Sequence, residues 1–229
     1  MKVYYDLHIH SVLSPCADVL MTPNNLLNMA MLKGLNLISI TDHNSLKQYP
    51  ILMELSKSYD FVLVPGVEIT TQEGIHCLVY FKTIDDAYQF EAVLDHHRQP
   101  LQTYAEAAVC DIEDNVIRTY STISSEPLRM TFDELCQRLH PYDHLLFLAH
   151  LDRKQPASLL VYTDSRLNGI ELMDITNEDF ITTYHLKQYR LLSSSDAHDL
   201  MQILEKGDHN VLDLPNVSIE SFFKEFSHE

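Results

Sequence analysis

Two histidines one residue apart close the first apolar run of the chain, in the stretch "YYDLHIHS". A β-strand points alternate side chains to the same face, so we predict that His8 and His10 lie together. Neutral imidazoles are common ligands of transition metals, and a metal site is therefore the chemical interpretation of this pair. Taken alone, such a pair is more often two surface histidines on an edge strand.

Similar side chains stand at the ends of the other apolar runs. A second pair with the same spacing, Asp196 and His198, lies in "SSSDAH" near the other end of the chain. In a parallel α/β barrel the carboxyl ends of all strands lie on one face, so residues far apart in sequence converge there. We predict a metal-binding pocket on that face, to which the intervening runs contribute Asp42, His43, Glu68, His76 and His150.

The pattern of strands and helices supports this convergence. Apolar runs such as "LNLISI" and "LLFLAH" alternate with helical segments, including residues 24–33, which Thr22-Pro23 precedes and Gly34 ends. Runs this apolar are buried on both faces, which indicates a mainly parallel sheet covered by helices, either a barrel or a doubly wound sheet. His76 differs from the other candidates because it begins its strand. That strand is therefore expected to run antiparallel to the others, or to start inside the rim of the pocket.

The length of 229 residues suits one large domain, and we predict a single domain over residues 1–229. The segment at about 83–142 interrupts the alternation and is interpreted as an insertion. Within it, "AAVCDIEDNVIRTYST" predicts a hairpin that turns at "EDN". Thr131 followed by Glu134 predicts a capped helix.

The composition limits which molecules the protein is expected to bind. A net charge of −17 argues against binding of long nucleic acid, which requires a basic face. A short anionic substrate remains compatible, because bound metal ions reverse the sign of the charge locally. No apolar run is long enough for a membrane span, and no glycine-rich nucleotide loop is present. Four scattered cysteines predict reduced thiols and a cytoplasmic location: Cys16, Cys77, Cys110 and Cys136.

Together, "DLHIHS", "TDHNS", "PGVEIT", "AH" and "SSDAH", in this order over about residues 3–200, resemble the polymerase and histidinol phosphatase (PHP) family of metallophosphoesterases. The resemblance implies a distorted (β/α)7 TIM-like barrel with two or three divalent metal ions at the carboxyl ends of its strands. Zinc, manganese and iron are the expected ions. The resemblance assigns three sets of ligands: His8, His10, Glu68 and Asp196; His43, His198 and a first-loop residue; and Glu68, as a bridge, with His76 and His150.

The first loop departs from the commoner family pattern. Many relatives have serine, aspartate and glycine shortly after the paired histidines, whereas here Ser14 is followed by "PCAD". Counted back from Pro23, Asp18 takes the place of the family's aspartate, and we predict it as the second-site ligand with Cys16 as the alternative. A cysteine ligand would favour zinc. Asp42 is expected to orient an imidazole rather than to bind an ion.

The predicted reaction is hydrolysis of a phosphate mono- or diester by a metal-bound hydroxide. A small phosphorylated substrate is expected, with nucleotides or short oligonucleotides favoured. His43 is the candidate for assisting proton transfer. Arg153, just after His150, is the candidate for binding a phosphate oxygen, and Arg98 is a weaker one.

Three other functions fit the same residues less well. One is a small-molecule phosphatase of the histidinol-phosphate type. Another is an amidohydrolase-type metal hydrolase, although that class usually places a carboxylated lysine on a middle strand end, where none is found here. The third is a non-catalytic metal-binding module, which the complete set of ligands argues against.

Overall fold

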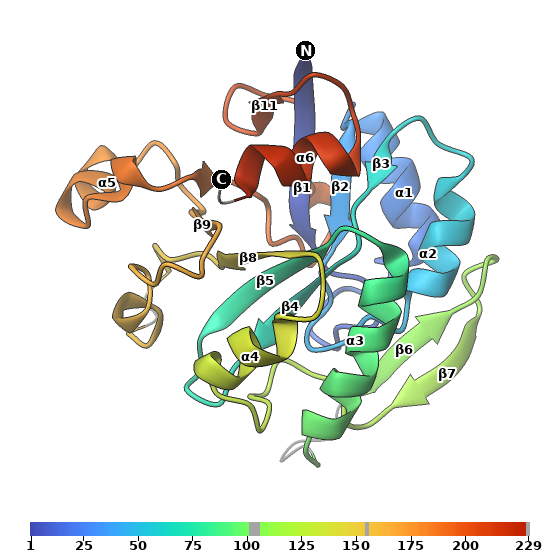
Figure 1. The fold of residues 1–229 in the computed structure, drawn as a ribbon. Coiled ribbons are helices and arrows are strands. Elements are labelled where there is room, and N and C mark those ends of the chain that lie inside the picture. The colour runs from blue at the N-terminus through green and yellow to red at the C-terminus, as the bar shows by residue number, and fades with distance from the viewer. Residues whose placement is uncertain (101–105, 154–155, 228–229) are drawn as a thin grey trace.

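The computed structural model describes residues 1–100, 106–153 and 156–227 and has an α/β fold built around two sheets (Figure 1). The first sheet has the order β11-β1-β2-β3. Its parallel strands are β1 (Lys2–Ile9), β2 (Leu37–Ile40) and β3 (Val62–Leu63). Strand β11 (Val211–Asp213) pairs with β1 in the antiparallel direction.

The second sheet has the order β10-β9-β8-β5-β4. Its strands are β4 (Gly66–Thr70), β5 (His76–Phe81), β8 (His144–Leu148), β9 (Gly169–Glu171) and β10 (Leu191–Leu192). Strand β5 runs antiparallel to both β4 and β8, which confirms the expectation drawn from His76. His76 pairs with Thr70, the last residue of β4, and thus lies at the end of the sheet where β4 and β8 finish.

Isolated bridges connect the two sheets at this end, between Ile9 and Ala197 and between His43 and Glu68. The predicted α/β class is confirmed. The described residues form separate sheets, and no continuous closed barrel is present among them.

Helices cover both sheets (Figure 1). They are α1 (Pro23–Leu32), α2 (Tyr49–Ser56), α3 (Ile84–His97), α4 (Phe132–Leu139), α5 (Glu178–Thr183) and α6 (Ile219–Phe226), with short 3-10 turns at Ser158–Leu160, Leu186–Gln188 and Leu200–Gln202. Helix α4 begins with the predicted capping box of Thr131 and Glu134. None of the helices within the described ranges has the length and apolar character that crossing a bilayer requires.

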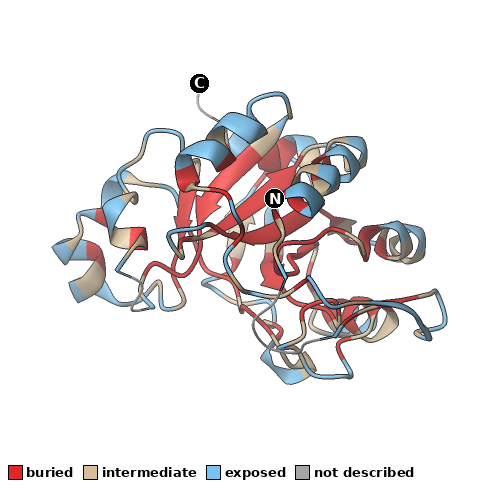
Figure 2. Ribbon diagram, turned by 90° about the horizontal axis from the view of Figure 1, so that it is seen from below, coloured by how far each residue is buried: buried red, intermediate tan, exposed pale blue. Residues whose placement is uncertain are grey.

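In the two sheets, alternate strand residues face two different apolar cores, and apart from β11 these strands are mostly buried (Figure 2). The inner core lies between the sheets and receives Leu7, Leu78 and Phe147. Phe222 of α6 packs into this core against Tyr80, with ring centroids 5.6 Å apart. The opposite faces of the strands pack against the helices in a larger outer core.

A shift in strand register determines which way the two paired histidines point. The pairing of β1 with β2 is irregular between Asp6 and Ile9. Before the shift Leu7 belongs to the inner core, whereas after it Ile9 belongs to the outer core. A bulge reverses the alternation of side chains in this way. His8 and His10 consequently lie above the inner core, at the carboxyl end of the strand.

The segment at 83–142 contains α3, the predicted hairpin and α4. Strands β6 (Ala107–Cys110) and β7 (Val116–Tyr120) are antiparallel, and the turn between them includes the predicted "EDN". The Gln48 side chain both donates to and accepts from the backbone of Cys110, at 3.0 and 2.9 Å. Phe90 and Leu135 of this segment lie in the outer core. Its interpretation as an insertion stays a prediction, and residues 101–105 lie outside the described part.

Candidate metal centre

Eight of the nine predicted ligands come together at the carboxyl ends of the strands, beside a cavity of about 260 Å³. They form three groups, within each of which the potential ligand atoms lie no more than 4.8 Å apart. The groups are His8, His10, Glu68 and Asp196; His10, His43 and His198; and Glu68, His76 and His150.

The first group has the spacing of a four-ligand metal site. The Nε2 atom of His8 lies 3.1 Å from His10 Nε2 and 3.2 Å from Asp196 Oδ1. His10 Nε2 lies 3.1 Å from the same Asp196 oxygen. Glu68 Oε2 lies 3.5 Å from the first imidazole nitrogen and 3.4 Å from the second. Tetrahedral ligands bonded to zinc at about 2.0–2.1 Å are about 3.3 Å from one another. These four side chains therefore fit one divalent ion.

Glu68 connects the three groups. Its Oε1 atom lies 2.8 Å from His76 Nδ1 and 3.1 Å from His150 Nε2, while its Oε2 atom lies 2.8 Å from His43 Nδ1. Although Glu68 Oε2 and His43 Nδ1 approach each other closely, they do not have the geometry of a hydrogen bond, and both atoms, like His150 Nδ1, are buried without a hydrogen-bond partner. Leaving such atoms unpaired costs about 1–3 kcal/mol each, so their convergence in one place is explained by a site for a cation.

Neighbouring side chains orient the paired imidazoles. His8 Nδ1 lies 2.9 Å from Glu171 Oε2, and His10 Nδ1 lies 3.0 Å from Ser14 Oγ. A nitrogen that donates in this way leaves the opposite Nε2 atom to face the group of ligands, as is usual for metal-binding histidines. Glu171 is the last residue of β9 and is fully buried. The sequence interpretation missed Glu171, although an acid that ends the apolar run "GIEL" carries the same signal as Glu68.

Ser14 also links Asp42 to the site. Its hydroxyl donates to Asp42 Oδ1 at 2.7 Å and accepts the backbone N–H of His43 at 3.0 Å. Asp42 accepts two further hydrogen bonds from Ser11, at 2.7 and 2.6 Å. The influence of Asp42 on the imidazole of His10 therefore passes through Ser14.

Several residues that follow strands adopt left-handed backbone conformations: Asn44, His150 and Asp196 have φ values of 54°, 30° and 49°. Such conformations are uncommon outside glycine and gather at functional sites. The Asn44 backbone N–H donates to Glu68 O at 2.7 Å. The buried Arg98 guanidinium donates to Asn44 O at 3.0 and 2.6 Å, which leaves no support for Arg98 as a phosphate contact.

The pKa values reflect the concentration of charge in the site. Burial opposes ionisation of Glu68, but the facing His43 and His8 outweigh it and hold the Glu68 pKa well below its usual range. Burial likewise opposes a charge on His43, yet Glu68 raises the His43 pKa to about 10. Burial lowers the pKa of His10 to about 3. The site thus holds protons on some imidazoles, and ligand sites of this kind exchange such protons for metal ions.

Asp18 and Cys16, the two first-loop candidates for a ligand of the second metal site, lie in different surroundings. Asp18 is exposed, its carboxylate accepts the Leu20 N–H at 2.8 Å, and it belongs to none of the three groups. Cys16 is also exposed and outside the three groups, but unlike Asp18 it lines the cavity. Burial raises the pKa of the Cys16 thiol, but hydrogen bonding to His198 and His43 outweighs it and lowers the pKa to about 7.

Arg153 lies at the rim of the cavity with its side chain 49 % exposed. Its guanidinium forms an ion pair with Asp196 Oδ2, on the side of the carboxylate away from the oxygen that faces His8 and His10. Ser125, from the loop after β7, lines the same cavity and was not singled out from the sequence.

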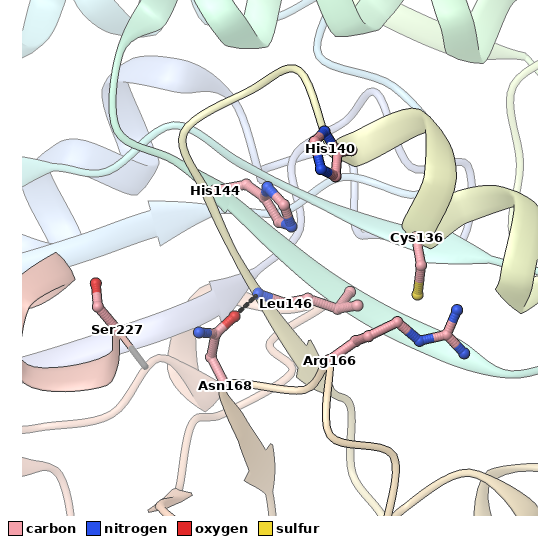
Figure 3. A pocket seen from close by; sticks show the side chains of 7 residues that line it. All are labelled: Cys136, His140, His144, Leu146, Arg166, Asn168 and Ser227. Atoms are coloured by element: carbon pink, nitrogen blue, oxygen red, sulfur yellow. Dashed lines mark hydrogen bonds between the residues drawn. The ribbon is translucent and has the colours of Figure 1, made fainter. Parts of the chain in front are cut away.

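A second cavity, of about 390 Å³, lies at the opposite end of β8, beside His144 and Cys136 (Figure 3). Arg166, which also lines it, forms ion pairs with Asp133 and Asp164. Another polar residue of the cavity, Asn168, is also hydrogen-bonded within the protein, since its Oδ1 atom accepts the Leu146 N–H at 2.8 Å. This cavity therefore has the character of a gap between packed elements.

Comparison with known proteins identifies the family, because the PHP domain matches residues 6–225. The chain belongs to the PHP domain family. The PHP domain of this chain is similar in structure to the lesion-specific endonuclease PfuEndoQ from Pyrococcus furiosus, with a TM-score of 0.71 and 22 % identity over 99 % of this chain and 56 % of that one.

Two further relatives are informative. A two-domain protein from Bacteroides vulgatus that contains a predicted PHP-like metal-dependent phosphoesterase has a TM-score of 0.59 and 18 % identity, over 99 % of this chain and 62 % of that one. A 5'-3' exoribonuclease of Haemophilus influenzae is 33 % identical over 79 residues, which is 33 % of this chain and 28 % of that protein. The PHP domain described here thus covers less than two thirds of each of these proteins.

Proposed function

We propose that this PHP domain is a metal-dependent phosphoesterase that hydrolyses phosphate mono- or diesters with two or three divalent ions. The observation that carries the proposal is the grouping of ligand atoms around Glu68, whose two oxygens face imidazoles of all three groups. Zinc, manganese or iron would be held by His8, His10, Glu68 and Asp196, by His43 with His198, and by Glu68 with His76 and His150. Such ions acidify bound water and neutralise phosphate charge.

Two neighbouring residues would orient the imidazoles of His8 and His10 and keep the proton of each ring on Nδ1. Glu171 and Ser14 accept the Nδ1 protons of His8 and His10, which keeps both Nε2 atoms directed at Asp196. Both contacts lie among fully buried side chains, and the one to the Glu171 carboxylate is a hydrogen bond to a charged group, which contributes about 1.5–3 kcal/mol. The ligands are therefore held in place before substrate arrives.

Arg153 is suited to bind a phosphate oxygen. Its guanidinium already lies beside the site, and half of its side chain is accessible to substrate. Guanidinium groups bind phosphate through two parallel hydrogen bonds. His43, in contact with Glu68 and lining the cavity, is the proposed group for assisting proton transfer.

A nucleotide or short oligonucleotide is the proposed substrate. Two of the similar proteins are named as an endonuclease and an exoribonuclease, which supports a nucleic-acid phosphodiester over other phosphate esters. The net charge of −17 favours a short substrate, because an acidic surface repels additional phosphates. The cavity of about 260 Å³ fits the reacting phosphate and its nearest neighbours rather than a long strand.

The test is hydrolysis of an aryl phosphate, a bis-aryl phosphate and a short oligonucleotide before and after removal and return of divalent ions. Glu68→Gln serves as the site variant. Glu73→Gln serves as its matched control, because Glu73 lies in the β4–β5 turn and accepts the Phe132 N–H at 3.1 Å, outside the three groups. We expect metal-dependent hydrolysis that Glu68→Gln abolishes and Glu73→Gln retains. A fully metal-loaded wild-type protein that cleaves none of these esters would contradict the proposal.

A further inference from the structure

The second group of ligand atoms lacks a ligand of its own. His10 is a member of both the first and the second group. Its Nε2 atom, at 3.1 Å from both His8 Nε2 and Asp196 Oδ1, fits a corner of the first site. One imidazole nitrogen has one lone pair and binds one ion. His43 and His198 are then left as a pair, whereas zinc sites in proteins have at least three protein ligands.

Cys16 lies beside this pair. It lines the cavity together with His43 and His198, and both imidazoles act to lower the pKa of its thiol. His43 is 4 % exposed, and its Nδ1 atom lies 2.8 Å from Glu68 Oε2, which leaves Nε2 as the ring nitrogen that can bind an ion of the second group.

The first loop holds Cys16 in this position through its backbone. The Ser14 N–H donates to Ser11 O and the Ala17 N–H donates to Ser14 O, each at 2.9 Å, so that Cys16 lies in the second of two consecutive turns. The Asp18 N–H donates to His198 O at 2.8 Å, which ties the loop to the segment that carries one of the two histidines. These turns direct the Asp18 carboxylate to the Leu20 N–H and away from the site.

We infer that the thiolate of Cys16 is the third protein ligand of the ion held by His43 and His198, and that this position takes zinc or another thiophilic ion. The inference rests on the proposed metal centre and adds the identity of one ligand and the class of ion. Thiolate ligands select zinc, whereas magnesium, calcium and manganese prefer oxygen. The ions of the centre are therefore expected to differ, with the most thiophilic at Cys16.

The test is reloading of the metal-free protein with Co²⁺, whose bond to a thiolate gives a charge-transfer absorption band in the near ultraviolet. Three variants are compared with the wild type. Cys16→Ser removes the thiolate, and Asp18→Asn removes the competing carboxylate while keeping an oxygen for the Leu20 N–H. Cys136→Ser is the matched control, because Cys136 is a free, partly buried thiol in the second cavity (Figure 3).

We expect the wild type, Asp18→Asn and Cys136→Ser to show the band, and Cys16→Ser to lose it together with about one equivalent of bound ion. Retention of all bound ions in Cys16→Ser, with about one equivalent of ion lost in Asp18→Asn, would overturn the inference. Unchanged spectra in all variants of a fully loaded protein would also overturn it. A wild type that binds no ion at all would instead contradict the proposed metal centre itself.

A measurement on the unaltered protein covers the case in which Cys16→Ser does not fold. Iodoacetamide is added to the metal-free and the Zn²⁺-loaded wild type, and the alkylated cysteines are identified by peptide mass spectrometry. Cys16 is the exposed member of the four free thiols, so it is expected to react in the metal-free protein. Zinc should slow that reaction at least tenfold and leave Cys136 unaffected. Equal reaction of Cys16 with and without zinc would refute the assignment.

Discussion

Replacing Glu171 by glutamine should weaken metal binding although Glu171 belongs to none of the three ligand groups. Glu171 Oε2 lies 2.9 Å from His8 Nδ1 and accepts the His150 N–H at 3.0 Å. The single oxygen thus holds one ligand by its ring and a second by its backbone. Glutamine keeps the size of the side chain but loses the charge that stabilises an Nδ1 proton.

Two contributions set the magnitude of the effect. Loss of a carboxylate that orients a metal-binding histidine costs about 10–100-fold in metal affinity, which is about 1.4–2.7 kcal/mol. The amide nitrogen of glutamine would also occupy the position of Oε1, which is buried without a partner. A buried, unpaired donor costs about 1–3 kcal/mol of folding stability. Glu171→Gln should therefore bind metal at least tenfold more weakly and unfold at a lower denaturant concentration.

The assay is competition for Zn²⁺ against a chelator of known affinity, combined with urea unfolding. Asp152→Asn is the matched control, because Asp152 accepts the N–H groups of Met173 and Asp174 at 2.9 and 2.8 Å and, among the described residues, is hydrogen-bonded to none of the predicted ligands. We expect the control to lose stability without losing metal affinity. Unchanged metal affinity in Glu171→Gln, with the two variants equally destabilised, would refute the role assigned to Glu171.

Three other results follow from the site. Glu68→Ala should lower metal content and abolish turnover, whereas Arg153→Ala should mainly raise KM; near-normal kcat and full metal content in the Glu68 variant would remove that residue from the site. Arg98→Ala should destabilise the fold by about 1–3 kcal/mol in urea unfolding, because it leaves the buried Asn44 O without its donors, while Glu91 keeps its ion pair with Lys47; an unchanged free energy of unfolding would contradict this. For oligonucleotides of increasing length, KM should change little and depend weakly on salt, with a log–log slope of about −0.7 for each of one or two phosphate contacts; a steep slope would reveal an extended basic track.

Much of the site was predictable because its residues keep the regular spacing of strands. His8 and His10 share a face, as period-two alternation requires, and Asp196 joins them from the far end of the chain. The hairpin in the 83–142 segment and the capped helix at Thr131 were predictable for a similar reason, because turns and caps have local sequence signals.

Other features depend on packing that no local pattern records. Asp18 and Cys16 are two residues apart, and only the turns of the first loop decide that the thiol faces the cavity. Glu171 became recognisable once β9 lay beside β8 and brought its carboxylate to His8. Arg98 resembled a surface phosphate contact, but its guanidinium is buried against the backbone of Asn44.

The polynuclear metal centre is the central claim, and the metal content of the protein purified without chelators tests it most directly. Elemental analysis should find between two and three equivalents of zinc, manganese or iron per chain, because three groups of ligand atoms meet around Glu68. The same sample, freed of metal, should lose its hydrolysis of phosphate esters and regain it when the ions return. A wild-type protein that holds at most one tightly bound ion would contradict the account.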